Sequence, residues 1–450
     1  MSGPSVWKFG GTSLRDAARV RAVAALVAEA PEPVVVVASA PAGVTEALLA
    51  LTCPGAGAIA ALDLADLRSR MKTIADDLGG SALVDEIDEV IDRRIAQLGA
   101  EEATDPAARD ALLALGEDVS VRLLEAALDD AGVRAERVDA RGVIRTDDHF
   151  GAAAPILDAI AAGAEVLAGV RAGTVAVVQG FIGADAEGRT TTLGRGGSDL
   201  TATLLGAALD SSAVHIWTDV DGILSGDPRW VERPRSLEVV GFEEAVELAW
   251  FGAQVIHAGA AKHAVAHRVP VRIRSTFAPE RPGTLILPER WGGPDIASVA
   301  CKRAVALIQV RSRPSAIEYG FLARVFGILT RHRTPVDLVA TSHTSTAFTL
   351  DEDADLDPLA AELDEVAEVE VRRGLATITV VGRGLLREPG FAARVFQTVA
   401  FTSVHLISQA TDSSLSFLVD DIEAEALVRR LHLVLIEGRM GHTEISRSTG

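Results

Sequence analysis

The amino-acid sequence predicts an α/β protein, a three-layer αβα sandwich followed by two ferredoxin-like βαββαβ units. Three observations lead to this prediction. Continuous apolar runs alternate with Ala- and Leu-rich stretches up to about residue 290. The pattern GFxARVF occurs at residue 320 and again at residue 390, each time within the same order of expected elements. Proline and glycine residues gather between residues 279 and 293, which indicates a boundary.

We therefore expect a first domain at residues 1–292 and a second region at residues 300–450. Five candidate strands of the first domain are mostly continuous apolar runs without the alternation of half-exposed strands, as expected of strands buried on both faces. They are Ser5–Phe9, Val34–Ala38, Thr174–Gln179, Ala213–Thr218 and Val271–Ser275. Helices are expected over Leu14–Ala30, Ala61–Leu98 with a break near Gly79-Gly80, Pro106–Ala131 and Leu200–Leu209.

The second region contains the two repeats, with a split near residues 372–385, and an interleaved arrangement of the repeats stays open. Each repeat starts with a helix, after Gly320 and after Gly390, and continues with two strands. A coincidental pair of amphipathic helices is the alternative, and the shared order of elements disfavours it. The repeats are typical of a small-ligand or dimerisation module. Their strands are expected at Val336–Ala340, Thr346–Leu350, Val404–Ser408 and Leu415–Val419.

Composition excludes several classes of partner. The net charge of -20 argues against nucleic acid and anionic membranes as main partners. Cys53 and Cys301 are too few for a disulfide framework and lack the spacing of metal ligands. The chain starts with a strand and has no uninterrupted apolar run of about 18 residues, so we expect neither a signal segment nor a membrane span. A cytoplasmic protein is the expectation.

The first candidate site is the segment from Val6 to Ser13, in which an apolar strand delivers Lys8 into a turn formed by Gly10 and Gly11. Lysine is rare here, with four residues against 39 arginines, and a compact ammonium is not interchangeable with a guanidinium. Strand, glycines, hydroxyls and a following helix together favour a phosphate site. An ordinary strand followed by a Gly-Gly turn is the alternative.

Two further glycine-rich or acidic loops follow. In TTLGRGGSD (residues 191–199), Arg195 suits a carboxylate or phosphate, whereas Ser198 and Asp199 are each consistent with a helix N-cap. In WTDVDGI and the residues after it (217–229), Asp219, Asp221 and Asp227 do not have the spacing of an EF-hand. That loop is either a solvated acidic turn or a nucleotide-contacting loop beyond a buried strand.

These three segments together resemble the aspartate kinases of the amino-acid kinase family, and the repeats resemble the tandem ACT domains of these enzymes. Further matching segments lie at residues 40–45, 116–117, 145–147 and 179–183. The resemblance implies transfer of the γ-phosphoryl group of ATP to the β-carboxylate of L-aspartate, giving 4-phospho-L-aspartate. This is the first step toward lysine, threonine and methionine. It implies Mg²⁺ carried with ATP, no separate metal site in the protein, and a homodimer or homotetramer formed through the ACT domains.

The resemblance also assigns roles to residues. Lys8 and Asp199 are the expected catalytic residues. Aspartate is expected to contact Thr45, Glu117, Phe181, Arg195 and Ser198, with Glu117 as partner of its ammonium and Arg195 of its α-carboxylate. The expected nucleotide-binding residues are Lys8, Gly10, Gly11, Ser198, Thr218, Asp219, Leu224, Asp227, Arg229 and Gln254.

Departures from the family pattern keep alternatives open. Gln254 stands where the family usually has lysine, Ala258 where it has proline, and Leu224 where it often has an aromatic residue. A catalytically weak amino-acid-sensing paralogue and a kinase of another amino-acid carboxylate are therefore the alternatives. The resemblance further implies feedback by lysine or threonine at the first ACT domain, through Gly320, Phe321, Leu322, Asp337, Thr341 and Ser342.

Overall fold

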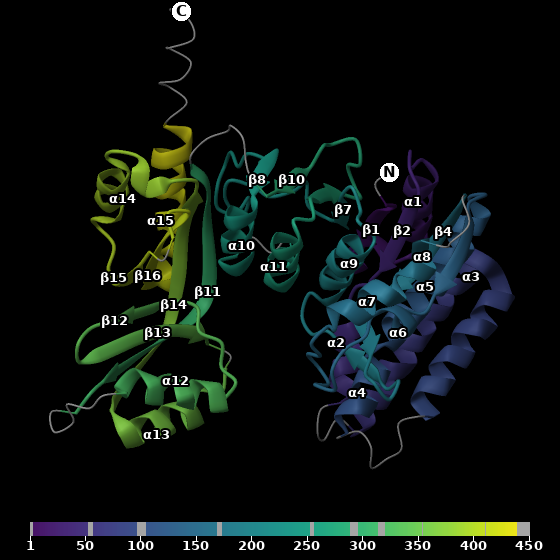
Figure 1. The fold of residues 1–450 in the computed structure, drawn as a ribbon, viewed down its shortest axis with the longest axis horizontal. Helices are drawn as coiled ribbons and strands as arrows, with labels where there is room; N and C mark the ends of the chain where they lie inside the picture. The colour runs from purple at the N-terminus through teal and green to yellow at the C-terminus, as the bar shows by residue number, and fades with distance from the viewer. Residues whose placement is uncertain are drawn as a thin grey trace, which may run out of the picture. The chain divides into compact units, whose positions relative to one another are not determined.

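The chain forms two compact units in the computed structural model (Figure 1). The first contains Met1–Ile223, Glu238–Val246 and Gln254–Trp291, and the second contains Leu224–Leu237, Glu247–Ala253 and Gly292–Gly450. The structure describes residues 3–52, 57–96, 105–168, 173–252, 256–288, 296–313, 320–352, 354–409 and 411–438. Within these ranges no helix has the length and apolar character needed to cross a membrane.

The first unit is built on an eight-stranded sheet with the order β3-β4-β2-β1-β7-β9-β10-β8. Neighbouring strands are parallel except for β9 and β10, which are antiparallel. A separate hairpin is formed by β5 and β6. The strands are β1 (Ser5–Phe9), β2 (Val34–Ala38), β3 (Arg134–Val138), β4 (Thr174–Gln179), β5 (Ile182–Ala184), β6 (Thr190–Thr192), β7 (Val214–Thr218), β8 (Val239–Gly241), β9 (Val271–Ser275) and β10 (Thr284–Leu287).

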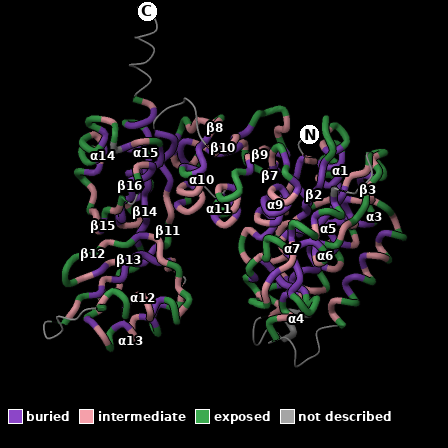
Figure 2. The backbone as a smooth tube through the Cα atoms, viewed as in Figure 1, coloured by how far each residue is buried: buried purple, intermediate pink, exposed green. Residues whose placement is uncertain are grey.

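All five predicted strands are confirmed as β1, β2, β4, β7 and β9, and only β7 starts one residue later than expected. β1 and β2 are buried almost throughout, which explains their continuous apolar runs (Figure 2), whereas β9 alternates buried residues with half-buried arginines, so the expectation of two buried faces is wrong for that strand. β3 escaped prediction because it is an exposed edge strand that carries charged residues on its open face. β5, β6, β8 and β10 are only three or four residues long, too short for a periodic signal.

Helices cover both faces of this sheet. α1 (Ala17–Ala28) and α5 (Leu115–Asp130) pack on one face, with α3 (Gly57–Ala96) against α5, and α9 (Gly197–Ala208) lies on the other. The predicted break in α3 is present at Gly80, where φ is 65°. The remaining helices are α2 (Val44–Leu51), α4 (Pro106–Leu113), α6 (Ala140–Val143), α7 (Leu157–Gly163), α8 (Glu165–Ala168), α10 (Phe242–Trp250) and α11 (Ala258–His267), and a 3₁₀ turn spans Gly11–Leu14 before α1.

The pleat of β1 determines where its lysine points. Trp7 and Phe9 are buried in the core formed with α1, α3 and α5. Because successive side chains of a strand point to opposite faces, Lys8 lies on the face covered by α9. The sheet thus presents an ammonium to the start of α9.

The second unit contains a six-stranded antiparallel sheet with the order β12-β13-β11-β14-β16-β15. Two separate cores lie on it, one beneath α12 and α13 and the other beneath α14 and α15. The elements are β11 (Ile296–Arg311), α12 (Phe321–Arg331), β12 (Val339–Thr341), β13 (Ser345–Asp351), α13 (Leu356–Val366), β14 (Glu368–Gly382), α14 (Phe391–Val399), β15 (Val404–Ser408), β16 (Ser414–Asp420) and α15 (Asp421–His432).

The two ferredoxin-like units share their long strands. The register of β11 against β14 shifts around Val305, so each strand contributes one half to each unit. The first ferredoxin-like repeat runs βαββαβ from the second half of β11 to the first half of β14. The last strand of the second ferredoxin-like repeat is the first half of β11, which precedes the first repeat in the sequence. The repeats are therefore interleaved, an arrangement that the sequence left open.

Candidate active site

The carboxyl ends of neighbouring parallel strands bring the predicted site residues to one edge of the first sheet. β1 leads into Gly10, β2 into the loop before Thr45, β4 into Phe181 and β7 into Thr218. β1 and β7 pair directly; from β1 the chain runs to β2 on one side, and from β7 it runs to β8 at the far edge on the other side before it returns to β9. Open α/β sheets bind ligands at such a change of connection.

The centre of this edge is an ion pair between Lys8 and Asp199. Lys8 Nζ lies 2.7 Å from Asp199 Oδ1, and each side chain is 12% exposed. Asp199 Oδ2 also accepts a hydrogen bond from His257 N at 3.3 Å. The N-cap of α9 is Gly196, in the left-handed region at φ 68°, without a side-chain cap. The N-cap interpretation of Asp199 is therefore wrong, because its carboxylate orients the lysine.

The two glycines after β1 allow a close approach of backbone segments. A Cβ on Gly11 would lie 2.7 Å from Ala40 O, so a side chain there would push apart the loops that follow β1 and β2. A Cβ on Gly10 would lie 3.6 Å from Lys8 Nζ. It would also lie 3.6 Å from Trp217 O, and the Gly10 amide donates to that same carbonyl at 3.1 Å, so this amide already has a backbone partner.

Glu117 stands at the start of α5 and is 2% exposed. Its Oε1 accepts a hydrogen bond from Ala40 N at 3.0 Å, whereas Oε2 is buried and has no partner among the described residues. Burial raises the pKa of Glu117 to about 8. A buried carboxyl oxygen without a partner is costly, and a ligand cation would supply that partner.

Phe181 and Ser198 lie together beside this site. Phe181 has a φ of 69°, which is rare outside glycine, and its amide donates to Thr201 Oγ1 at 3.1 Å. A Cβ on Gly180 would lie 2.7 Å from both Cβ and Oγ of Ser198, so the turn after β4 packs directly on the start of α9. Strained backbone of this kind persists where surrounding contacts hold it, and it often marks functional sites.

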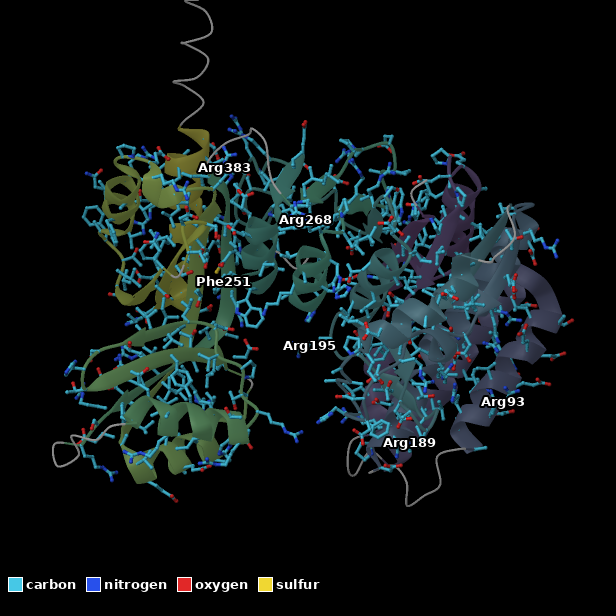
Figure 3. All side chains as sticks on the ribbon, viewed as in Figure 1. Arg93, Arg189, Arg195, Phe251, Arg268 and Arg383 are labelled. Atoms are coloured by element: carbon cyan, nitrogen blue, oxygen red, sulfur yellow. The ribbon has the colours of Figure 1, made fainter. Side chains whose placement is uncertain are left out.

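Arg195 follows β6 on the loop that leads to α9, and its side chain is exposed (Figure 3). In the described part of the chain no ion pair involves Arg195. Thr45 is half-buried on α2, one residue after the helix begins. Both side chains are thus available to a ligand at the carboxyl edge of the sheet.

The residues predicted to bind nucleotide fall into both compact units. Thr218 and Asp219 belong to the first unit, where Thr218 Oγ1 donates to Asp219 Oδ1 at 3.1 Å. Leu224, Asp227 and Arg229 belong to the second. Arg229 binds the Asp227 carboxylate through its own side chain, and this hydrogen bonding holds the pKa of Asp227 below its ordinary value.

Gln254 lies outside the described residues.

The segment after Leu224 is anchored to the second unit by a hydrogen bond of 2.8 Å between Ser225 Oγ and His432 Nε2. Both of these side chains are fully buried, so this Ser–His contact is a structural one.

Asp337, predicted to bind an effector, already has two partners. Its Oδ2 lies 2.6 Å from Lys302 Nζ, and its Oδ1 accepts a hydrogen bond from Trp250 Nε1 at 2.9 Å. The side chain is 5% exposed, and burial raises its pKa. Asp337 therefore holds a lysine ammonium supplied by the chain itself.

The other predicted effector residues are spread over the first ferredoxin-like unit. Gly320, at φ 87°, is the N-cap of α12, and Phe321 and Leu322 begin that helix. Thr341 and Ser342 are exposed and line a cavity of about 410 Å³ with residues of β11, β13 and β14. Gly320, Phe321, Leu322 and Asp337 do not line that cavity.

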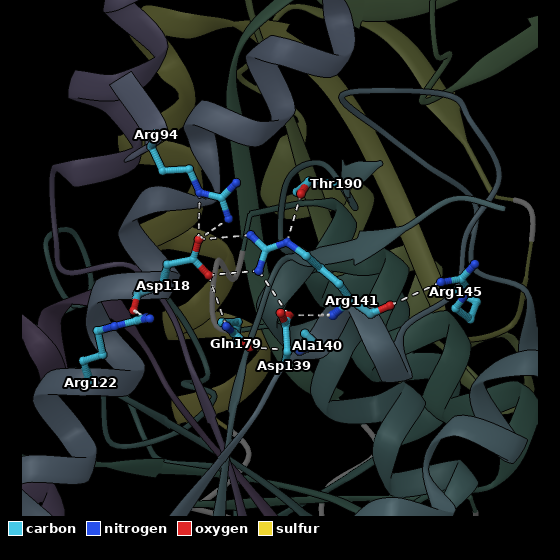
Figure 4. Close-up of polar contacts among 9 residues, drawn as sticks. All are labelled: Arg94, Asp118, Arg122, Asp139, Ala140, Arg141, Arg145, Gln179 and Thr190. Carbon is cyan, nitrogen blue, oxygen red and sulfur yellow. Dashed lines mark hydrogen bonds and ion pairs between the residues drawn. The ribbon is translucent and has the colours of Figure 1, made fainter. Parts of the chain in front are cut away.

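Buried acids on α4 and α5 are functional candidates that sequence reasoning missed. Asp110 Oδ2 accepts hydrogen bonds from Gly151 N at 2.8 Å and from Thr192 N at 2.7 Å, which fixes the strand that leads to Arg195. Asp118, next to Glu117, is the centre of the network in Figure 4. Acidic residues inside the apolar stretch at residues 110–124 were the available signal, because such residues are almost never buried without a partner.

The sequence matches known families over both units. Residues 4–275 match the Amino acid kinase family, and residues 378–435 match the ACT domain. The chain is 37% identical over 450 residues to lysine-sensitive aspartokinase 3 of Escherichia coli (strain K12), covering 97% of this chain and 100% of that protein. It is 34% identical over 461 residues to the chloroplastic aspartokinase 1 of Arabidopsis thaliana, covering 96% of this chain and 80% of that protein.

The fold is also similar to solved structures. The structure of E. coli aspartokinase III in complex with aspartate and ADP (R-state) matches with a TM-score of 0.87 at 37% identity, covering 96% of this chain and 99% of that chain. The structure of the same enzyme in complex with lysine and aspartate (T-state) matches with a TM-score of 0.80 and the same coverage.

Proposed function

The chain belongs to the aspartokinases of the amino acid kinase family and is an ATP-dependent aspartate kinase, and from this premise we propose how its own residues carry out the reaction. The observation that supports the proposal most is the Lys8–Asp199 ion pair at the carboxyl end of β1. It places one ammonium, oriented by one carboxylate, at the change of connection between β1 and β7.

In the proposed reaction an oxygen of the aspartate β-carboxylate attacks the γ-phosphorus of ATP. The bond between the γ-phosphorus and the β,γ-bridging oxygen breaks, and that oxygen leaves on ADP with its electron pair. The attacking carboxylate is already ionised at neutral pH, so no general base is required. Lys8 neutralises the charge on the transferring group, and Asp199 holds the ammonium in place.

Aspartate is recognised at both of its α-substituents in this proposal. Its ammonium binds the unpartnered Oε2 of Glu117, and its α-carboxylate binds the exposed guanidinium of Arg195. Thr45, Phe181 and Ser198 complete the pocket. The buried carboxyl favours an amino acid with a free ammonium over its acylated counterpart, which carries no cation.

ATP with its Mg²⁺ binds beside Gly10, Gly11, Thr218 and Asp219 of the first unit in this proposal. Mg²⁺ carried with ATP would supply positive charge to the phosphates. The proposal includes a cytoplasmic location and assembly as a homodimer or homotetramer through the ACT domains. The exposed apolar residues Val339 and Ile407, on the edge strands β12 and β15, support the assembly.

Trapping the acyl phosphate as a hydroxamate tests the function. We expect product from ATP, Mg²⁺ and L-aspartate, and little from glutamate or N-acetylated amino acids. Product with another acid but not with aspartate would favour a different carboxylate kinase. Folded protein that gives no product with any acid would favour the amino-acid-sensing alternative.

We propose lysine rather than threonine as the feedback effector. Asp337 is paired with the ammonium of Lys302, so in this proposal a free lysine displaces Lys302 to reach the carboxylate, and the support for lysine comes from the relative. The E. coli relative named above is lysine-sensitive, and one of its structures contains lysine. In the hydroxamate assay we expect millimolar lysine to lower the rate and threonine to leave it unchanged.

Asp337→Asn should raise the lysine concentration for half-inhibition by about tenfold, because a hydrogen-bonded charge in a buried site is lost. Asp351→Asn is the matched control, since Asp351 also pairs with Lys302 but is 44% exposed. A flat activity curve for both amino acids with unmodified protein would contradict feedback control.

A further inference from the structure

Arg141 is a buried arginine that touches three different parts of the first unit (Figure 4). It extends from α6, and its side chain is only 16% exposed. Its Nη1 and Nη2 donate to Oδ1 and Oδ2 of Asp118, each at 3.0 Å, in a bidentate pair. Its Nε donates to Thr190 Oγ1 at 2.9 Å, and Nη1 also lies 3.1 Å from Asp139 Oδ1.

Asp118 receives a second guanidinium besides that of Arg141. Arg94 already donates to Asp118 Oδ2 at 2.6 Å from Nη2 and at 3.1 Å from Nε. Gln179 Nε2 donates to Oδ1 at 3.1 Å. Burial alone would raise the pKa of Asp118, and the guanidinium groups of Arg141 and Arg94 together hold it below its ordinary value. Arg141 thus neutralises Asp118 and, through its bond to Thr190, also ties this carboxylate to β6, which is a geometric task beyond neutralisation.

That task follows from what each contact is attached to. Asp118 directly follows Glu117 on α5, so holding Asp118 holds the carboxyl proposed to bind the substrate ammonium. Thr190 begins β6, whose chain continues through Leu193 and Gly194 to Arg195. The bidentate pair also fixes the guanidinium plane, which leaves Nε only one direction for its bond to β6.

We propose that Arg141 is a positioning residue for aspartate. By binding α5 and β6 at the same time, it sets the separation between Glu117 and the loop that carries Arg195. The zwitterionic end of the substrate must match this separation. The inference rests on the proposed function, because it assumes that these two residues take the ammonium and the α-carboxylate.

Steady-state kinetics of Arg141→Met, Thr190→Val and Arg94→Met test the proposal, with both substrates varied. Arg141→Met should raise KM for aspartate by about tenfold or more, since small displacements in a binding site have large effects. KM for ATP should change by less than about twofold, because in the proposed function Glu117 and Arg195 bind aspartate and not ATP. Thr190→Val removes the hydrogen bond between Arg141 and β6 and should raise KM for aspartate by about threefold, with the same selectivity.

Arg94→Met is the matched control, because it removes a guanidinium from the same carboxylate and leaves the bond between Arg141 and Thr190 in place. It should change KM for aspartate by less than about twofold. Equal increases in KM for ATP and aspartate, or an effect of Arg94→Met as large as that of Arg141→Met, would overturn the proposal. An unchanged KM for aspartate in Thr190→Val would also overturn it. This second variant keeps the proposal testable if Arg141→Met fails to fold. Failure of the unmodified protein to phosphorylate aspartate would instead refute the proposed function itself.

Discussion

Replacing Lys8 by methionine should lower kcat for aspartate phosphorylation by about 10³-fold, the upper range for removal of one group that stabilises transition-state charge. Lys8 is the ammonium at the carboxyl end of β1, and Asp199 Oδ1 lies 2.7 Å from it. Methionine keeps the length and apolar stem of the side chain, so the pleat of β1 and the packing of α9 are retained. Hydroxamate formation at saturating ATP and aspartate measures kcat directly.

The same substitution leaves Asp199 mostly buried without its cation, so Lys8→Met should also destabilise the protein. The double variant with Asp199→Asn removes the unpaired charge. We expect it to recover thermal stability toward that of the unmodified protein without recovering activity. This pattern separates loss of catalysis from loss of folding.

Lys72→Met is the control for a general effect of removing a lysine. Lys72 is one of four lysines in the chain, and it lies outside the proposed active site. Lys72 is 40% exposed on α3 and pairs with Asp88. We expect its kcat to change by less than about twofold, as for other surface ion pairs. A Lys8→Met variant with kcat near that of the Lys72 control would rule out the proposed role of Lys8.

Features that depend on short stretches of sequence could be predicted from the sequence alone. The buried strands, the repeat after residue 300 and the glycines around Lys8 and Arg195 carry short-range signals: apolar runs, repeated patterns and turn residues. The catalytic roles of Lys8 and Asp199 were expected only through the family resemblance, and the structure shows that the two side chains form an ion pair. Residues 191 positions apart meet only because the pleat of β1 and the start of α9 face each other.

The groups that escaped prediction depend on tertiary contacts. Arg141 has no distinguishing neighbours in the sequence, and its role appears only when α5 and β6 lie on either side of it. Likewise, nothing local in the loop after Asp219 indicates that Leu224 onward joins the second unit through His432. A single chain reports propensity and pattern, whereas contacts of large sequence separation are set by the whole fold.

Replacing Glu117 by glutamine should lower kcat/KM for aspartate by about 10²–10³-fold, the effect of removing one partner of a buried charge pair. The rate at saturating ATP should remain limited by aspartate over the accessible concentration range, while KM for ATP changes little. Glu125→Gln on the same helix is the matched control. Glu125 Oε2 lies 2.7 Å from Arg137 Nε, and neither residue belongs to the proposed substrate pocket. This variant should leave kcat/KM within about twofold of the unmodified protein.

The raised pKa of Glu117, about 8, adds a pH signature. Only the ionised carboxylate pairs with an ammonium, and at pH 7 roughly a tenth of this group is ionised in the free enzyme. kcat/KM for aspartate should therefore rise with pH up to about 8 and then level off. Aspartate binding at pH 7 should release close to one proton, measured by calorimetry in buffers of different ionisation enthalpy. Glu117→Gln should release none.

Stability should show the opposite trend with pH. Between the ordinary pKa of 4.5 and the folded-state pKa of about 8, Glu117 is protonated when folded and ionised when unfolded. Its contribution to the free energy of unfolding is complete below the lower value and is lost as pH rises to the upper one. Glu117→Gln should therefore gain stability over the unmodified protein as pH increases from 5 to 8, measured by denaturant unfolding.

The two trends together test one physical statement. Burial disfavours the ionised carboxylate in the protein without substrate, and the same burial strengthens the interaction between the carboxylate and the substrate ammonium once it is bound. A merely structural carboxyl would change stability without proton release on aspartate binding. An ionised carboxylate with an ordinary pKa would give a flat kcat/KM profile between pH 6 and 8. Either result would remove Glu117 from substrate recognition.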